Sequence, residues 1–160
     1  MNLRPAIAAD IPLLMDLERA SPTAAHWTEQ QYRQAVEPGR DHTTRLVLVA
    51  EVTPLASAAR DSRFSLVGFL VARHVGLEWE LENIVVAPSA RRQGVGRQLL
   101  DALLAVGREK SSESVFLEVR KSNEAARKLY ENAGFQPTGR RKSYYVDPPE
   151  DAILYRRKLP

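Results

Sequence analysis

The chain has 160 residues, of which 44% are hydrophobic, and its 23 basic and 20 acidic side chains give a formal net charge of +3. This length and apolar content suit a single domain, residues 1–160, with one buried core. The chain contains no cysteine, which excludes disulfide bonds, thiolate metal sites and a cysteine nucleophile. The positive charge fits an anionic ligand but, taken alone, would also fit weak nucleic-acid binding.

The histidines and the apolar runs exclude further classes of protein. His26, His42 and His74 lack the spacing of metal ligands, so we expect no metal. The amino terminus has no apolar core of signal-peptide length, and no apolar run approaches the roughly 18 residues of a membrane span. We therefore expect a cytoplasmic protein without a membrane partner.

The first half of the chain predicts two helices. Asp10 followed by Pro12 is typical of a helix start, with Asp10 as the capping residue, and the apolar residues that follow keep helical spacing. A second helix is expected over residues 28–36, ending at the Pro-Gly pair of residues 38–39.

Two strands should follow these helices. Residues 46–52 and 65–71 form short apolar runs rich in β-branched side chains, which is typical of strands. Between them, residues 53–63 contain a proline, small residues and charges, and we expect a long hairpin loop there.

The second half of the chain alternates strands and helices. A strand ending at Val86 precedes a helix. The apolar face of this helix is formed by Val95, Leu99, Leu100, Leu103 and Val106. A strand over residues 115–119 follows, and then a helix that Asn123 caps and Gly134 ends.

The chain should end in a hairpin. Two strand-like runs, residues 142–146 and 152–158, are divided by a turn-forming Asp-Pro-Pro-Glu sequence. Together with the preceding elements, this order predicts a mixed α/β sheet.

The most informative motif is the turn over residues 91–97, between the strand that ends at Val86 and the helix that follows. Gly94 and Gly96 allow a ligand to approach the backbone, and the three arginines of the turn supply positive charge. The first turn of a helix also offers N–H groups without a partner in the helix, together with the positive end of the helix dipole. The turn therefore predicts a binding site for a diphosphate.

The residues after the second glycine narrow the choice of diphosphate. A nucleotide-hydrolysing loop would continue with Lys and Ser or Thr, whereas Gly96 is followed by Arg97 and Gln98. A dinucleotide-binding loop would have a third glycine at the position of Leu99. Arg-x-x-Gly-x-Gly after a strand ending in Val-x-Pro instead resembles the acetyl-coenzyme A (acetyl-CoA) signature of the GNAT superfamily of N-acetyltransferases.

A carboxylate lies within the apolar strand expected over residues 115–119. Because strand residues alternate in direction, Glu118 faces away from its apolar neighbours. A carboxylate in such a strand is unfavourable unless it is paired or functional. It could pair with Arg120 or Lys121, or it could accept a proton from an attacking amine.

The helix after this strand carries Asn123 and Tyr130, which are seven residues apart and share a face. Tyr130 falls on the inward side, where a phenol hydroxyl normally needs a partner. With a reference pKa of about 10, a phenol stays protonated at neutral pH and can donate a proton to a leaving thiolate. A carboxylate and a phenol suit amide formation from a thioester, which requires no protein nucleophile.

Motifs between residues 81 and 154 strengthen the resemblance. They read Asn-Ile-x-Val-x-Pro, Arg-Arg-Gln-Gly-x-Gly, Leu-Glu-Val-Arg, Leu-Tyr-Glu-x-x-Gly-Phe, Arg-x-x-Tyr-Tyr and Glu-Asp-Ala. Together they resemble the ribosomal-protein alanine N-acetyltransferases (RimI-like) within the GNAT superfamily. The resemblance implies a single-domain α/β GNAT fold with a mixed central sheet of six to seven strands flanked by four helices.

The resemblance also implies roles for individual residues. Glu118 would be the catalytic base, with Glu80 as the second candidate, and Tyr130 would be the catalytic acid. Acetyl-CoA would contact Ile84, Val85, Val86, Arg91, Arg92, Gln93, Gly94, Val95, Gly96, Arg97 and Asn123. Candidate contacts to the acceptor are Trp27, Glu80, Tyr144 and Tyr145. Packing would also explain Trp27, and helix capping would also explain Asn123.

The sequence thus predicts an enzyme that transfers the acetyl group of acetyl-CoA directly to an amine in a ternary complex. We expect the acceptor to be the N-terminal α-amino group of a protein such as a ribosomal protein. An α-amine, with a reference pKa near 8, is partly neutral at physiological pH, whereas a lysine, near 10.4, would demand a stronger base. The alternatives are a small-molecule amine acetyltransferase and a module that binds acetyl-CoA without turnover. Nucleic-acid binding has only net charge in its favour.

Overall fold

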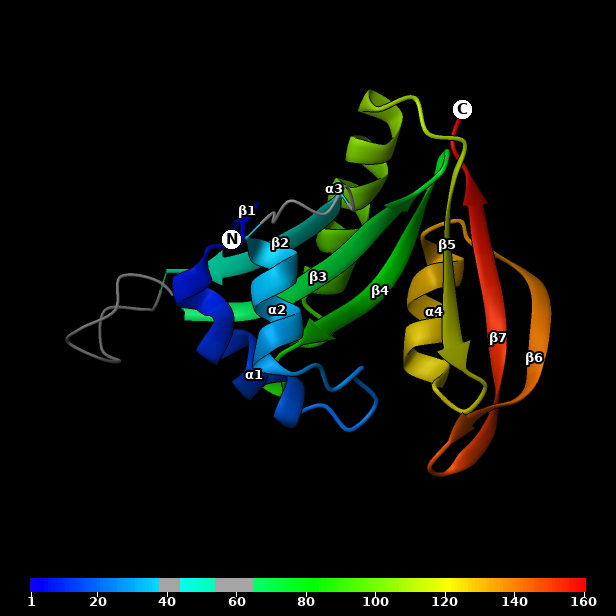
Figure 1. The fold of residues 1–160 in the computed structure, drawn as a ribbon, viewed down its shortest axis with the longest axis horizontal. Helices are drawn as coiled ribbons and strands as arrows, with labels where there is room; N and C mark the ends of the chain where they lie inside the picture. The colour runs from blue at the N-terminus through cyan, green and yellow to red at the C-terminus, as the bar shows by residue number, and fades with distance from the viewer. Residues whose placement is uncertain (38–43, 54–64) are drawn as a thin grey trace. The chain divides into compact units, whose positions relative to one another are not determined.

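The computed structural model describes residues 1–37, 44–53 and 65–160. In these residues the helices are α1 Ile11–Arg19, α2 Glu29–Val36, α3 Val95–Glu109 and α4 Glu124–Asn132 (Figure 1). The strands are β1 Asn2–Pro5, β2 Arg45–Val52, β3 Ser65–Val75, β4 Glu78–Val86, β5 Ser114–Arg120, β6 Gln136–Val146 and β7 Pro149–Lys158. The predicted helix end at residues 38–39 and the predicted loop from residue 54 to 63 lie outside the described residues.

The strands form a mixed sheet, as predicted. Their hydrogen-bonded neighbours follow the order β1-β2-β3-β4-β5-β7-β6. β4 and β5 pair in parallel, whereas β1–β2, β2–β3, β5–β7 and β6–β7 pair in antiparallel fashion. The described residues group into two compact units. We call them the amino-terminal unit, residues 1–73 and 82–99, and the carboxy-terminal unit, residues 74–81 and 100–160.

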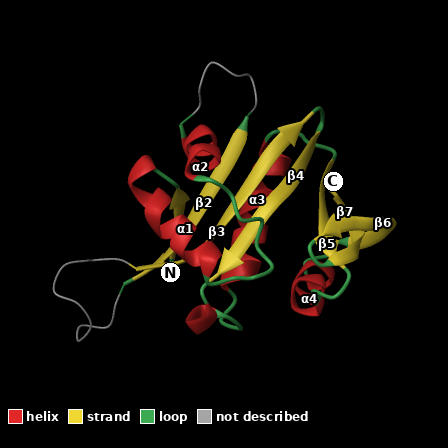
Figure 2. Cartoon of the chain, turned by 60° about the horizontal axis from the view of Figure 1, so that its bottom comes forward, coloured by secondary structure: helices red, strands yellow, loops and turns green. Residues whose placement is uncertain are grey.

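In the amino-terminal unit, α1 and α2 lie over one face of β2 and β3 (Figure 2). Because strand residues alternate in direction, Val47 and Val49 of β2 both reach these helices. They form a buried core with Ile11, Leu14, Tyr32, Ala35, Phe69, Val71 and Val85. On the other face, a Cβ added to Gly68 would lie 3.1 Å from Val95 Cγ1. Gly68 therefore allows the start of α3 to pack closely on the sheet.

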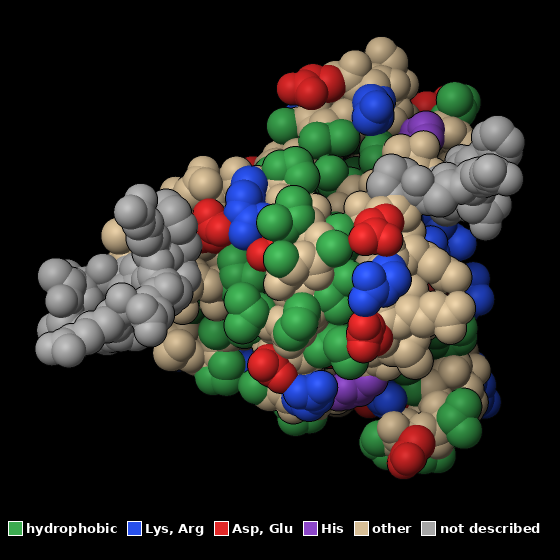
Figure 3. Space-filling model, turned by 60° about the vertical axis from the view of Figure 1, so that its left-hand side comes forward, with side chains coloured by type: hydrophobic (Ala, Val, Ile, Leu, Met, Phe, Trp, Pro, Cys, Tyr) green, Lys and Arg blue, Asp and Glu red, His purple; other side chains and the backbone are tan. Residues whose placement is uncertain are grey.

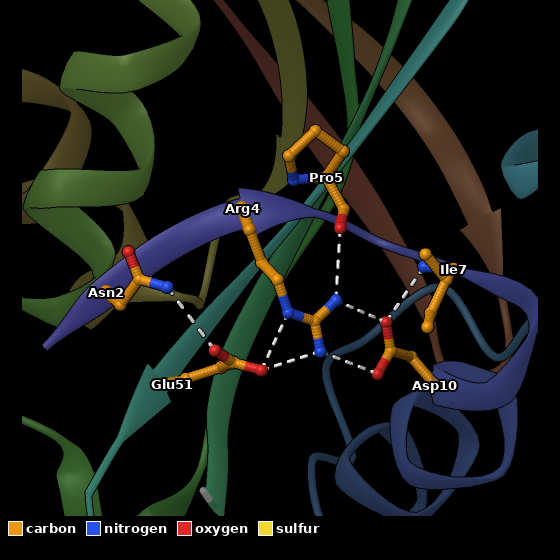
Figure 4. A network of polar contacts seen from close by, with 6 residues as sticks. All are labelled: Asn2, Arg4, Pro5, Ile7, Asp10 and Glu51. Carbon is orange, nitrogen blue, oxygen red and sulfur yellow. Dashed lines mark hydrogen bonds and ion pairs between the residues drawn. The ribbon is translucent and has the colours of Figure 1, made fainter.

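Asp10 precedes α1 as predicted, but its side chain does not cap that helix. The carboxylate instead accepts from Arg4 Nη1 at 2.7 Å, from Arg4 Nη2 at 2.9 Å and from the Ile7 N–H at 2.8 Å (Figure 4). Arg4 Nε also donates to Glu51 of β2 at 2.7 Å. Burial raises the pKa of Asp10, but the hydrogen bonds from Arg4 and Ile7 outweigh it and the pKa is lowered overall. The prediction that the Asp10 side chain caps α1 was therefore wrong, because Arg4 binds the carboxylate instead.

The surface turned forward in Figure 3 carries basic and acidic side chains around an area of hydrophobic ones, among the residues drawn in colour. Exposed ion pairs of this kind occur on the first two helices, where Arg19 pairs with Asp16 at 2.5 Å and Arg33 with Glu29 at 2.8 Å. Such exposed pairs contribute little to stability.

In the carboxy-terminal unit, β5 has the first residues of β4 on one side and β7 on the other. Residues 78–80 of β4 pair with residues 114–116 of β5, and β7 pairs with both β5 and β6. Leu117 of β5 and Tyr155 of β7 lie opposite each other and share a face. The ring of Tyr130, on α4, packs 6.2 Å from the ring of Tyr155, so α4 covers this face.

The last two strands begin earlier than the sequence predicts. β6 begins at Gln136 instead of residue 142, and β7 begins at Pro149 instead of residue 152. β6 is exposed along almost its entire length, so no apolar alternation marks its first half. Its register on β7 also shifts twice. The predicted starts were wrong because an exposed, irregular edge strand carries little periodic signal.

Candidate functional site

The turn predicted to bind a diphosphate lies at the start of α3, in the amino-terminal unit. Arg92 and Gly94 have left-handed backbones, with φ of 61° and 81°. Glycine adopts this conformation freely, whereas for Arg92 it costs roughly 1–2 kcal/mol. The Gln98 N–H bonds to the Gly94 carbonyl at 3.0 Å. The N–H groups of residues 95–97 therefore precede the first hydrogen bond of the helix and form its donor end.

Arg91 holds this turn to its surroundings. Its Nε donates to the Val86 carbonyl and its Nη2 to Ser21 Oγ, each at 3.3 Å. Ser21 is a buried residue after α1, and no sequence signal connected it with the turn. The Arg91 guanidinium therefore supports the turn from within the amino-terminal unit.

The other residues predicted to contact acetyl-CoA differ in exposure. Arg92, Gln93, Gly94 and Arg97 are exposed, Ile84 and Val86 are half-buried, and Val85, Val95 and Gly96 are buried. Gln93 donates from Nε2 to the Ser89 carbonyl at 2.9 Å, which braces the turn. A Cβ added at Gly94 would meet only Gln98 Nε2, at 4.0 Å. The space in front of Gly94 is therefore open to a ligand, as far as the described residues show.

Glu118 lies in the carboxy-terminal unit, on β5, and it is paired. Its carboxylate meets Arg141 Nε of β6 at 3.0 Å, and not Arg120 or Lys121, the partners considered from sequence. Arg120 instead donates from Nη1 to the Pro148 carbonyl at 3.0 Å. The ion pair joins residues of two strands that are not neighbours in the sheet order.

Tyr144 and Tyr145 lie beside this ion pair. Their rings are perpendicular, with centroids 5.2 Å apart, and the Arg141 guanidinium carbon is 5.2 Å from the centroid of the Tyr144 ring. The pKa of Tyr144 is raised above 10.0, first by hydrogen bonding to Glu118 and then by burial, with a smaller contribution from the charge of Glu80. Burial, followed by the charge of Glu118, raises the pKa of Tyr145 to about 12. Of the predicted site residues, the structure thus brings Glu118, Tyr144 and Tyr145 together, and Glu80 is close enough for its charge to act on Tyr144.

Tyr130, on α4, packs against the face of β5 on which Leu117 lies, whereas Glu118, the next residue in the strand, faces the other way. Tyr130 is 5% exposed, and burial, followed by the neighbouring Tyr145, raises its pKa. No hydrogen bond from its hydroxyl to another residue of the described chain is found, and the phenol remains protonated at neutral pH.

Asn123 caps α4, as the sequence predicts. Its Oδ1 accepts from the Ala126 N–H at 3.2 Å, and the side chain is half-buried. Capping occupies the carbonyl oxygen only, so the side-chain NH₂ group has the chemistry to meet a ligand as well.

Trp27 packs within the amino-terminal unit. Its ring lies 5.5 Å from that of Tyr32, and its N–H donates to Glu18 Oε2 at 2.9 Å. Glu18 is only 3% exposed and accepts from Asn83 Nδ2 at 2.8 Å. These contacts explain the position of Trp27 by packing and hydrogen bonding, and its predicted role toward the acceptor stays a prediction.

Two further features concern metals and membranes. In residues 1–37, 44–53 and 65–160, no group of three or more His, Asp or Glu side chains is placed to hold a metal ion. None of the helices in these ranges has the length and apolar character needed to cross a membrane.

Comparison with known proteins identifies the family. The sequence model described as "Acetyltransferase (GNAT) family" matches residues 13–135. The [Ribosomal protein bS18]-alanine N-acetyltransferase of Escherichia coli K12 is 41% identical over 91 residues, which cover 56% of this chain and 62% of that protein. The N-alpha-acetyltransferase RimI of Mycobacterium tuberculosis is 39% identical over 97 residues, 58% of this chain and 60% of that protein. The matched segment thus spans less than two thirds of either relative.

Solved structures agree in fold. The ribosomal-protein-S18-alanine N-acetyltransferase from Escherichia coli superposes with a TM-score of 0.74 at 27% identity, covering 99% of this chain and 93% of that one. The NAA60 protein of Arabidopsis thaliana, in complex with acetyl-CoA, gives a TM-score of 0.83 at 16% identity over 99% and 98% of the two chains, which shows the fold alone. This chain therefore shares the fold of the Escherichia coli N-acetyltransferase. The chain belongs to the acetyltransferase (GNAT) family.

Proposed function

We propose that this protein is an acetyl-CoA-dependent N-acetyltransferase that acetylates the N-terminal α-amino group of a protein. Family membership and the geometry of the turn before α3 support the proposal. The single observation that carries it is the left-handed backbone at Arg92 and Gly94, directly ahead of the donor end of α3. A backbone of this kind makes a concave set of N–H groups for an anion.

The turn would hold the diphosphate of acetyl-CoA. The N–H groups of residues 95–97 would donate to phosphate oxygens, and the exposed guanidiniums of Arg92 and Arg97 would supply countercharge. Open space in front of Gly94 fits this use. When bound, acetyl-CoA supplies an activated acetyl thioester, so this chain needs no nucleophile of its own.

Protons would be moved by side chains of the carboxy-terminal unit. Glu118 would accept a proton from the attacking amine, directly or through a water, with Glu80 as the second candidate. Tyr130, which burial keeps protonated at neutral pH, would donate a proton to the leaving thiolate. Asn123 would contact acetyl-CoA through its side-chain NH₂ group.

The acceptor is best matched by a protein amino terminus. The paired rings of Tyr144 and Tyr145 lie next to Glu118, so they would flank an amine that Glu118 deprotonates. The Escherichia coli relative that is 41% identical acts, by name, on alanine of ribosomal protein bS18, which makes a ribosomal protein the first acceptor to test. Such an acceptor would place the protein in the cytoplasm.

The release of free thiol from acetyl-CoA tests this proposal. The acceptors should be peptides with amino-terminal Ala or Ser, the same peptides with a blocked amino terminus, and small primary amines. We expect turnover with the free peptides and none with the blocked ones. Turnover only with small amines would assign the protein to metabolite or drug acetylation. Calorimetric binding of acetyl-CoA without thiol release would indicate a non-catalytic module, and no binding at all would overturn the proposal.

A further inference from the structure

We propose that Asp151 is a positioning residue that holds a bulge in β6 and thereby brings Arg141 and Tyr144 to the Glu118 carboxylate. The geometric part of the proposal stands alone, and its kinetic consequences rest on the proposed function. Asp151 lies on β7, opposite the irregular part of β6. Asp151 is the central residue of the Glu-Asp-Ala motif, and that motif alone does not indicate what the carboxylate contacts.

The bulge is visible in the strand register. Arg141 pairs with Ala152, and Tyr145 pairs with Glu150. Three residues of β6, 142–144, therefore stand opposite a single residue of β7, Asp151. Extra residues of this kind bend a strand and redirect its side chains.

This bulge includes a non-glycine residue in an unfavourable conformation. Ser143 has a left-handed backbone, with φ of 52°, which L-residues with a side chain adopt rarely. Its N–H has left the strand ladder and donates to Asp151 Oδ1 at 2.7 Å. The Ser143 conformation thus depends on an acceptor placed across the hairpin, and Asp151 supplies it.

Asp151 is itself held in place. Its Oδ2 accepts from Arg140 Nε at 2.6 Å, and its backbone carbonyl accepts from the Lys121 N–H, after β5, at 3.1 Å. Its side chain is 15% exposed. The hydrogen bond from the Ser143 N–H is the largest cause that lowers the pKa of Asp151. The carboxylate therefore connects the bulge in β6 to the end of β5.

The bulge changes which side chains share a face. In a regular strand, residues three apart point to opposite faces, so Arg141 and Tyr144 would not meet. Here both reach Glu118: Arg141 Nε lies 3.0 Å from its carboxylate, and hydrogen bonding to Glu118 raises the pKa of Tyr144. The proposed base is thus enclosed by two side chains that a bulge-free β6 would separate.

Four variants of the complete chain test the proposal in two matched pairs. Asp151→Ala removes the acceptor for Ser143, whereas Asp151→Asn keeps an oxygen there and loses only the charge that pairs with Arg140. Ser143→Val places a β-branched residue where φ is positive, whereas Ser143→Gly accepts that conformation. Urea unfolding of each variant identifies any that fails to fold, and the second pair keeps the test decisive in that case.

The first readout is independent of activity. Tyrosines labelled with ¹³C at Cζ are titrated by NMR, with signals assigned from Tyr→Phe variants. We expect Tyr144 to titrate above pH 10 in the wild type, in Asp151→Asn and in Ser143→Gly. It should return toward 10 in Asp151→Ala and Ser143→Val. A Tyr144 titration that is the same in Asp151→Ala or Ser143→Val as in the wild type would overturn the proposal, as would equal changes in Asp151→Asn and Asp151→Ala.

The second readout is steady-state kinetics with the best peptide acceptor. Asp151→Ala and Ser143→Val should lower kcat/KM for the acceptor by about tenfold or more, because small misplacements of catalytic groups have large effects on rate. KM for acetyl-CoA should stay within about twofold of wild type, and the conservative variants should retain most of the rate. Equal losses for both substrates would indicate a merely structural role and overturn the proposal. If the wild type transfers no acetyl group, the proposed function fails. The NMR titration still tests whether Asp151 holds the bulge in β6.

Discussion

The turn over residues 91–97 and the cluster around Glu118 are built in opposite ways. The turn uses consecutive residues, and its proposed binding groups are largely backbone N–H groups whose direction is set by two left-handed residues. The cluster uses side chains from β5 and β6, held by an ion pair and a bulge between strands. A backbone site depends on local conformation, whereas a side-chain site depends on strand register. Substitutions should therefore act on the two regions by different routes.

The largest effect is expected from Glu118→Gln, which keeps the shape of the side chain and removes its ability to accept a proton. We expect kcat to fall by about 10²–10⁴-fold, the usual contribution of a general base. The dissociation constant for acetyl-CoA, measured by calorimetry, should not change, since binding is assigned to the turn.

Two controls separate the causes of this loss. Glu80→Gln alters the rival base, and a larger fall in kcat there would transfer the role to Glu80. Arg141→Gln removes the cation that pairs with the Glu118 carboxylate, and it reports how much of the loss arises from the broken ion pair alone.

The next largest effect is expected from Tyr130→Phe. Loss of the proposed acid should lower kcat by about 10²-fold, with acetyl-CoA affinity nearly intact. Tyr155→Phe is the matched control, because Tyr155 is also buried but its hydroxyl is engaged with Glu131 at 2.6 Å. An unchanged kcat in Tyr130→Phe would remove the assigned role.

The same variant carries a prediction on stability and pH. Burial raises the pKa of folded Tyr130, while the unfolded chain has the ordinary value of about 10. The stability from keeping this phenol neutral is complete below about pH 10 and is lost as pH rises through the folded pKa. Urea unfolding above pH 10 should show a steeper loss in the wild type than in Tyr130→Phe.

The same contrast explains what could be predicted from the sequence. The helices, the turn and most of the central strands follow from neighbouring residues, whereas β1 and the starts of β6 and β7 do not. Thr28, Asn123 and Gly134 accordingly occupy the helix ends that their types indicate. The partner of Glu118 could not be predicted in this way. Arg141 lies on β6, which is not the neighbour of β5 in the sheet, and the order of residues along the chain does not show which side chains meet across a sheet.

Competition between partners accounts for another error. Asp10 has the side chain of a helix cap, and its position before α1 is as predicted, yet Arg4 and the Ile7 N–H bind its carboxylate. Similarly, Ser21 contacts Arg91 from a distant part of the chain. Local preference predicted where these residues lie, whereas tertiary contacts decide what they bind.

The network of Arg4 tests whether the two regions respond separately. Arg4→Met leaves the buried carboxylates of Asp10 and Glu51 unpaired and should lower the free energy of unfolding at pH 7 by about 3 kcal/mol, the lower end for buried ion pairs. Because the folded pKa of Asp10 is lowered, its stabilising effect is present above about pH 4 and is lost as pH falls through the folded value. The variant should therefore lose stability less steeply in acid.

This destabilisation should be confined to the amino-terminal unit. The NMR titrations of Tyr144 and Tyr145 in folded Arg4→Met should match those of the wild type. Wild-type stability in the variant would mean that solvent or other groups compensate for the missing guanidinium. Altered tyrosine titrations would mean that the two regions are coupled.

The smallest effect is expected at Arg92, where one substitution should raise stability and weaken acetyl-CoA binding. Arg92→Gly removes a side chain that is strained at φ of 61°, but a glycine also gives the unfolded chain more freedom, so the variant should be more stable by under about 1 kcal/mol. It also removes one exposed charge near the proposed diphosphate, which should raise the dissociation constant for acetyl-CoA about threefold, since exposed ion pairs contribute at most about 1 kcal/mol. Arg92→Asn, a residue type that tolerates the left-handed conformation, should weaken binding to the same degree with less gain in stability. Tighter binding in either variant would show that the Arg92 guanidinium does not face the ligand, and the diphosphate would then depend on the backbone N–H groups and Arg97.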